Sequence, residues 1–358
     1  MPTSPMTSIG EDWRVTPPEA AGFFPTLGRK LAAGIESGLL HHLHAVLVSR
    51  EGELVLEHYE QGRDENWGMP LGEVAFGAET LHDLRSVTKS VVGLLYGIAL
   101  DRGLVPAPDA PLVAQFPDYP DLQADPLRQR LTIDHALTMT LGLEWDENRS
   151  YADPLNSEIA MEQAADRCRF ALDRPVVEEP GRRWIYSGGA VALLGAIIER
   201  GTGCSLPDFA RDALFAPLGI PIFEWSRGRD GVASAASGLR LSARDLLRIG
   251  GLVLGKGLFA GRRVVSERWI GQSLTPSVAL EDGLGYGRLW FTAEAPVPAL
   301  GGSRRWAAGF GNGGQRLWLM PDADLATVVF SGNYNAPDAW VSPTRVWREI
   351  VLANLVRA

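Results

Sequence analysis

The chain has 358 residues, of which 46% are hydrophobic and 22% charged, and its formal net charge is −9. This composition is that of an ordinary globular protein long enough to bury a large core. The negative charge and the lack of a basic run argue against a nucleic-acid binder and against binding to an anionic membrane surface. The two cysteines allow at most one disulfide and are typical of a reducing compartment.

The N-terminal segment, residues 1–22, is polar and rich in proline and predicts a loose arm without the apolar core of a signal peptide. The longest apolar run, residues 91–100, is too short to span a bilayer. We therefore expect a cytoplasmic protein with no membrane partner. The sequence leaves the oligomeric state open between a monomer and a homodimer.

The first third of the chain predicts a β-hairpin followed by a long core helix. Residues 44–49 and 54–59 are β-rich runs separated by a segment that contains Gly52, a pattern typical of a hairpin. The helix begins near Ser86, is apolar on most faces and ends at Gly103. The other segments are, in order, a helical patch at 20–37, a glycine-rich connection at 61–80 and an extended loop at 104–130.

The middle of the chain is predicted to be mostly helical and its end mostly β. Helices are expected at residues 131–142, 157–172, 190–200, 207–214, 242–254 and 266–274. Short strands are expected at 285–292, 306–309, 315–320 and 325–331, before a final helix at 337–356. Strands near both chain ends predict an α+β fold with one antiparallel sheet built from both ends and flanked by helices.

This pattern also predicts how the chain is divided. We expect the N-terminal arm 1–22, an α/β sandwich lobe formed by 23–105 and 284–358, and a mostly helical lobe formed by 106–283. The active site is expected between the two lobes, because clefts between units are common ligand sites.

Ser86 and Lys89 stand three residues apart at the start of the long helix, which places both side chains on one face about a turn apart. A hydroxyl nucleophile with an amine that can take its proton has this arrangement. Lys30, Lys89 and Lys256 are the only lysines among 34 basic residues. Arginine cannot be deprotonated in a protein, whereas a buried lysine can be driven towards its neutral amine. The alternative interpretation is structural: Ser86 caps the helix and Lys89 extends to solvent.

Three other motifs are interpreted as structural segments without a binding function. His41, His42 and His44 precede a strand without a carboxylate or cysteine ligand pattern, so we predict no metal site there. Residues 309–314 match G-x-G-x-x-G, but a strand rather than a helix follows them, which argues against a dinucleotide fingerprint. Residues 250–256 match G-x-x-x-x-G-K, but a glycine replaces the Ser or Thr that would bind magnesium.

Tyr186-Ser187-Gly188 follows a Pro-Gly turn and precedes a helix, in a loop that can project into a cleft. Its alternative interpretation is a tyrosine packed beside Trp184. Taken in order, the motifs resemble the serine β-lactamase and DD-peptidase superfamily, especially its class C-like branch of family VIII carboxylesterases and 6-aminohexanoate-dimer hydrolases. The resemblance extends from about residue 40 to the end and rests on residues 86–90, 131–143, 186–188, 237–245 and 306–314.

The resemblance implies an acyl-enzyme on Ser86, with Lys89 and Tyr186 sharing proton transfer and with no metal or organic cofactor. Backbone N–H groups of Ser86 and Phe310 would form the oxyanion hole. The expected substrate-binding positions are Tyr151, Trp184, Gly188 and Gly309.

Two departures from the family pattern narrow the expected activity. Gly188 replaces the asparagine that holds the substrate amide in lactam-cleaving members, and Ala307-Ala308-Gly309 replaces Lys-Thr-Gly and so loses a cation. Both changes argue against an efficient β-lactamase or DD-peptidase. We expect a carboxylesterase on small esters. The alternative is an amide hydrolase of the 6-aminohexanoate-oligomer type, and the second alternative is a weak β-lactamase or DD-peptidase or a non-catalytic binding protein.

Overall fold

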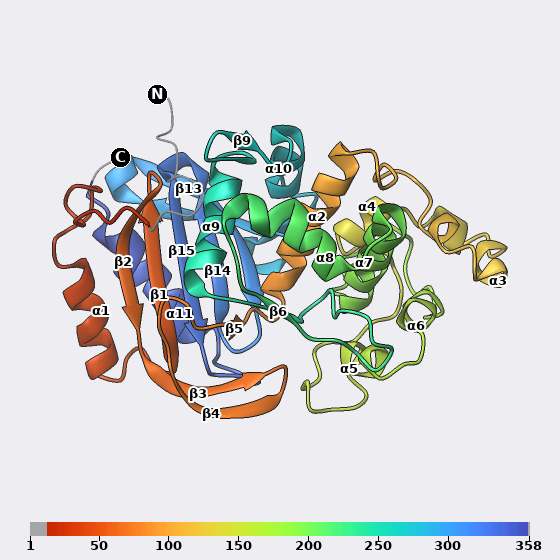
Figure 1. Cartoon of the computed structure of the whole chain (residues 1–358), viewed down its shortest axis with the longest axis horizontal. Coiled ribbons are helices and arrows are strands. Elements are labelled where there is room, and N and C mark those ends of the chain that lie inside the picture. The colour runs from red at the N-terminus through yellow and green to blue at the C-terminus, as the bar shows by residue number, and fades with distance from the viewer. Residues whose placement is uncertain (1–12, 357–358) are drawn as a thin grey trace.

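The computed structural model describes residues 13–356. Its main sheet has eight antiparallel strands in the order β10-β11-β12-β13-β14-β15-β1-β2 (Figure 1). The strands are β1 Leu43–Arg50, β2 Glu53–Tyr59, β10 Val278–Ala279, β11 Gly285–Tyr286, β12 Phe291–Val297, β13 Gly302–Gly311, β14 Gln315–Met320 and β15 Leu325–Ser331. Because β1 pairs with β15, the predicted sheet built from both chain ends, and with it the α+β class, is confirmed.

The remaining strands form three small sheets, and the α-helices lie around the main sheet and beyond it (Figure 1). These strands are β3 Gln61–Asn66 with β4 Met69–Ala75, β5 His82–Asp83 with β6 Glu224–Trp225 and β7 Leu239–Leu241, and β8 Leu258–Phe259 with β9 Arg262–Arg263. The helices are α1 Leu27–Glu36, α2 Val87–Asp101, α3 Pro120–Gln123, α4 Ile133–Leu137, α5 Ser157–Glu162, α6 Arg167–Leu172, α7 Gly188–Thr202, α8 Leu206–Ala210, α9 Ala243–Leu254, α10 Glu267–Leu274 and α11 Val341–Arg345.

Strand β1 explains why the sheet lies at the centre of the fold. Ala45 and Leu47 join the core that contains α2 and α9, whereas Val46 and Val48 join the core that contains α1 and the C-terminal helical segment. Successive side chains of a strand point to opposite faces, so a continuous apolar run marks a strand covered on both sides. All eight residues of β1 are buried accordingly.

Helix α2 carries the candidate nucleophile at its start and is enclosed by other elements. Every residue from Val87 to Ala99 is buried. Gly97 allows α10 to approach closely, because a Cβ there would lie 2.1 Å from Cδ1 of Trp269. The indole N–H of Trp269 donates to the carbonyl of Gly93 at 3.0 Å. Helix α2 is therefore well packed against α10, and Ser86 directly precedes its first residue.

Several segments differ from the prediction, and the predicted loop at 104–130 contains the short helix α3. Residues 61–80, expected as a connection, contain the β3–β4 hairpin; its second strand is almost wholly exposed, so it lacks the apolar alternation that identifies strands. The helix expected at 157–172 is divided into α5 and α6. The side chain of Asp166 accepts a hydrogen bond from the backbone N–H of Arg169 and so starts a second helix inside the predicted one.

Other helix ends shift by a few residues. Helix α4 ends at Leu137, before Met139, which has a φ of 59°. The segments after α8 and α11 continue as π-helical turns over Arg211–Phe215 and Val346–Val351. Within residues 13–356, each helix is too short or too polar to cross a membrane.

The predicted N-terminal arm lies partly outside the structure. Residues 1–12 are outside the described residues, while Trp13 is buried and Val15 forms a parallel bridge to Leu54. Helix α9, from the predicted helical segment, packs against β14 and β15 of the main sheet. The division of the chain into an arm and two lobes stays a prediction.

Candidate active site

The structure brings Ser86, Lys89 and Tyr186 together at the start of α2. The amine of Lys89 donates to Oγ of Ser86 at 2.9 Å and to the carbonyl of Ala236 at 3.1 Å. Tyr186, in the loop before α7, lies beside them: Nζ of Lys89 is 4.8 Å from the centroid of its ring. The alternative that Ser86 caps the helix while Lys89 extends to solvent is wrong on both points. The Ser86 side chain makes no capping hydrogen bond, and Lys89 is only 1% exposed.

Strand β13 lies against the same end of α2 because two of its glycines leave room. A Cβ at Gly309 would lie 3.0 Å from Val87, and one at Gly311 would lie 2.4 Å from the carbonyl of Leu84. Phe310 lies between these glycines, so its ring points to the opposite face of the strand. There it stacks on Phe291 with ring centroids 4.8 Å apart. The backbone of β13 thus lies beside the nucleophile without intervening side chains.

Two buried glutamates, missed in the sequence analysis, lie beside Lys89. Oε2 of Glu158 is 3.9 Å from Nζ of Lys89 and has no hydrogen-bond partner, while its Oε1 accepts from Ser237 at 2.5 Å. Glu147 accepts hydrogen bonds from the indole of Trp145 and from the backbone N–H of Gly188. Both carboxyls face the space above Gly188, where a Cβ would lie 3.1 Å from each.

Three neighbouring acidic groups oppose the effect of burial on the pKa of Lys89. Burial alone would lower the pKa of Lys89, but Tyr186, Glu158 and Glu147 together raise it above its usual value. Burial thus acts on Lys89 in the expected direction, but the neighbouring acidic groups oppose it and favour the ammonium. Burial raises the pKa of the Tyr186 phenol, although the Lys89 ammonium opposes that rise. Burial and Glu158 raise the pKa of Glu147 to about 7.

Ser86 opens into a pocket of about 240 Å³. Tyr151, one of the predicted substrate-binding residues, lines it and donates from its hydroxyl to Glu147 at 3.1 Å. Trp67 at the tip of the β3–β4 hairpin lines the same pocket and donates to Ser237 at 3.1 Å. The hairpin that the sequence analysis missed therefore forms one wall of the candidate site.

The other predicted substrate-binding positions lie around this pocket and do not line it. Trp184 packs beside Tyr186 and Tyr286, with ring centroids 5.7 and 5.5 Å away. Gly188 supports the two glutamates and Gly309 contacts α2. Their role in substrate binding stays a prediction.

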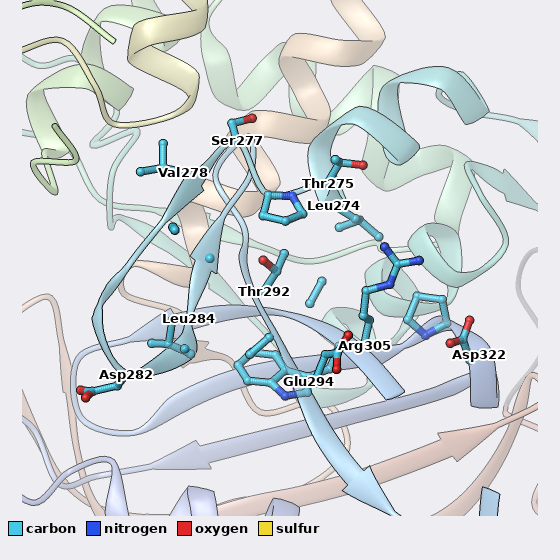
Figure 2. A pocket seen from close by; sticks show the side chains of 18 of the residues that line it. Leu274, Thr275, Ser277, Val278, Asp282, Leu284, Thr292, Glu294, Arg305 and Asp322 are labelled. Carbon is cyan, nitrogen blue, oxygen red and sulfur yellow. The ribbon is translucent and has the colours of Figure 1, made fainter. Parts of the chain in front are cut away.

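A larger hollow of about 850 Å³ lies at the edge of the main sheet. Figure 2 shows Thr292 and Glu294 of β12, Arg305 of β13 and Asp322 around it. Its lining includes none of Ser86, Lys89 and Tyr186. The smaller pocket is therefore the candidate active site.

A buried serine hydrogen-bonded to a lysine one helical turn away, beside an antiparallel sheet with helices on both faces, is the arrangement of a serine hydrolase. The sequence model of the beta-lactamase family matches residues 41–348. The chain therefore belongs to the beta-lactamase family, and within it to the serine hydrolases.

Individual relatives have different activities. The 6-aminohexanoate-dimer hydrolase of Paenarthrobacter ureafaciens is 26% identical over 340 residues, covering 88% of this chain and 78% of its own. Esterase EstB of Burkholderia gladioli is 34% identical over 183 residues, covering 49% of this chain and 44% of its own. The solved structure of EstCE1, a hydrolase with promiscuous acyltransferase activity, matches with a TM-score of 0.69 at 17% identity and covers 90% of this chain and 96% of its own.

Proposed function

We propose that the protein hydrolyses small carboxylic esters through an acyl-enzyme on Ser86. The observation that carries this proposal is the 2.9 Å hydrogen bond from the Lys89 amine to Oγ of Ser86. Oγ would attack the ester carbonyl carbon, and its proton would pass to the Lys89–Tyr186 pair and then to the departing alcohol. Water would attack the acyl-enzyme in turn, releasing the acid and returning the proton to Ser86.

The proton acceptor is best treated as a pair. Lys89 and Tyr186 lie side by side next to Ser86, and each shifts the pKa of the other, so their titrations are coupled. The two glutamates favour the Lys89 ammonium, and the ammonium in turn favours the Tyr186 phenolate. We therefore assign the proton transfer to the pair as a unit.

Negative charge on the attacked carbonyl oxygen would be held by backbone donors. We propose the N–H groups of Ser86 and Phe310, because β13 lies against the start of α2 at Gly309 and Gly311. The positive end of the α2 dipole adds to this stabilisation. Losing one oxyanion donor typically costs about 10²–10³ in rate.

Among the substrates considered, an ester requires the fewest binding groups beyond Ser86, Lys89 and Tyr186. Gly188 offers no side-chain amide to a lactam, and Ala307 offers no cation to a substrate carboxylate. The pocket of about 240 Å³ suits a small acyl group. Its walls come from both predicted lobes, Ser86 from one and Tyr151, Glu158 and Ser237 from the other, which supports the proposed division with the site between them. Esterase EstB is a relative with this activity in its name.

A second candidate is hydrolysis of short amides that carry a free ammonium. It is favoured by Oε2 of Glu158, a buried acceptor without a hydrogen-bond partner in a residue that lines the Ser86 pocket. The 6-aminohexanoate-dimer hydrolase aligns over 88% of this chain. Amide cleavage also requires protonation of the leaving nitrogen, which the Lys89–Tyr186 pair could supply.

A substrate panel separates these candidates. Initial rates would be measured on p-nitrophenyl acetate and butyrate, a chromogenic cephalosporin and the linear 6-aminohexanoate dimer, with Ser86→Ala as the control. Ester turnover that is lost in the variant supports the carboxylesterase. Dimer turnover favours the amidase, cephalosporin turnover favours a β-lactamase, and no turnover on any substrate favours a binding protein.

A further inference from the structure

Three residues that are distant in sequence meet beside the active-site segment. His44 on β1, Asp64 on β3 and His82 on β5 are all buried, and each has a ligand atom within 4.8 Å of the others. The chain has six histidines in total, and two of them place ring nitrogens 2.9 Å apart here. None of the three residues belongs to the Ser86 pocket.

The imidazole of His82 is held in one orientation. Its Nδ1–H donates to the backbone carbonyl of Asp83 at 3.0 Å, so Nε2 carries a lone pair and accepts a 2.9 Å hydrogen bond from Nδ1 of His44. Metal-binding histidines are commonly fixed in this way by a carbonyl on their other nitrogen. The rings of Phe330 and Phe76 stack on His82 and His44 at 4.5 and 4.2 Å and hold both imidazoles in place.

Asp64 adds a buried carboxylate to the two histidines. It is 5% exposed, and its Oδ1 accepts from the hydroxyl of Tyr334 at 2.8 Å. Oδ1 also lies 3.7 Å from Nε2 of His82. Oδ2 has no hydrogen-bond partner and forms an ion pair with Nη2 of Arg240 at 3.6 Å. A buried acceptor without a hydrogen bond is costly, and a cation bound by the carboxylate would reduce that cost.

We propose that His44, Asp64 and His82 bind one divalent transition-metal ion. Two imidazole nitrogens and one carboxylate oxygen are typical ligands of Zn²⁺ and of Co²⁺ in its place. The Asp64 carboxylate offers Oδ1, which lies 3.7 Å from Nε2 of His82, and the hydroxyl of Tyr334 orients it.

The ion would have a structural role beside the active site. It would join β1 of the main sheet to β3 of the hairpin, and that hairpin carries Trp67 into the Ser86 pocket. His82 lies in the strand directly before the α2 segment that carries Ser86. The ion would thus fix the hairpin wall and the approach to the nucleophile, and it takes no part in the reaction.

The test uses the full chain, stripped with a chelator and titrated with Zn²⁺ and separately with Co²⁺. We expect one ion per chain by calorimetry, visible absorption bands from protein-bound Co²⁺, and an increased melting temperature with either ion. A stripped protein that binds no stoichiometric ion and shows no shift in melting temperature would overturn the proposal. The three residues would then form a hydrogen-bonded network only.

Matched variants locate the ion. Asp64→Asn keeps the size of the side chain and an acceptor for Tyr334, and we expect it to weaken Zn²⁺ binding at least 100-fold. His58→Gln, on β2 and facing Glu60, is the control and should bind as the wild type does. Tyr334→Phe leaves all three ligands intact and should weaken binding about 10-fold or more, as for other outer-shell partners. Full affinity in both Asp64→Asn and Tyr334→Phe would place the ion elsewhere and refute the assignment.

Discussion

Replacing Glu158 by Gln should move the pH dependence of ester turnover to lower pH. The carboxylate lies 3.9 Å from Nζ of Lys89, and both side chains are almost fully buried. At an effective dielectric constant of about 20, two charges at this separation interact by about 4 kcal/mol, which corresponds to about three pKa units. The glutamine removes this charge and keeps an acceptor for the hydroxyl of Ser237.

The direction follows from the groups that Glu158 faces. Its charge raises the pKa of Lys89 and also that of Tyr186. Removing the charge lowers both, so whichever member of the pair accepts the Ser86 proton, its deprotonated form is reached at lower pH. We expect the rising limb of kcat/KM against pH to move down by at least about one unit, since relaxation of the site reduces the full Coulomb value.

The assay is the pH profile of p-nitrophenyl butyrate hydrolysis for the wild type, Glu158→Gln and Glu162→Gln. Glu162 is the matched control because it is buried on the same helix but accepts from Ser234 and pairs with Arg167 instead of Lys89. The control should lose stability while its profile keeps the wild-type midpoint. A Glu158→Gln limb that stays in place or moves to higher pH would refute the role assigned to this carboxylate.

Further substitutions test the site and the packing around it. Lys89→Arg should lower kcat by about 10²–10⁴-fold, because arginine cannot release a proton; steady-state kinetics with near-normal turnover would contradict this. Gly97→Ala should destabilise the fold by about 1–3 kcal/mol in urea unfolding, since its Cβ would overlap Trp269, whereas Gly271→Ala on α10 meets open space and should be neutral or stabilising by up to about 1 kcal/mol. Gly188→Asn should displace the two buried carboxyls and reduce ester turnover without producing cephalosporin turnover; an active β-lactamase would show that the glutamates do not fill this space.

Local patterns were sufficient to predict the contact between Ser86 and Lys89 and most of the sheet. Ser86 and Lys89 are one helical turn apart, so their contact depends only on the helix that the apolar run predicts. Strands β1 and β15 are recognisable because they are apolar on both faces. Tyr186 is far away in sequence, and the resemblance to a family was needed to place it beside them.

Contacts that depend on the tertiary fold could not be read from the sequence. Glu147 lies in a loop and Glu158 on a short helix, and neither forms a motif with Lys89. The one signal was Gly188: a glycine where the family has a larger side chain leaves a volume that other groups must fill. The β3–β4 hairpin was missed because its exposed second strand lacks the alternation on which strand prediction depends.

The most direct test of the account is intact-mass analysis of the protein after reaction with a fluorophosphonate, for the wild type and Ser86→Ala. The account predicts one adduct per wild-type chain, located by peptide mapping on Ser86, and no adduct on the variant. An unlabelled wild type, or a variant labelled to the same extent, would contradict the assignment of Ser86 as the nucleophile.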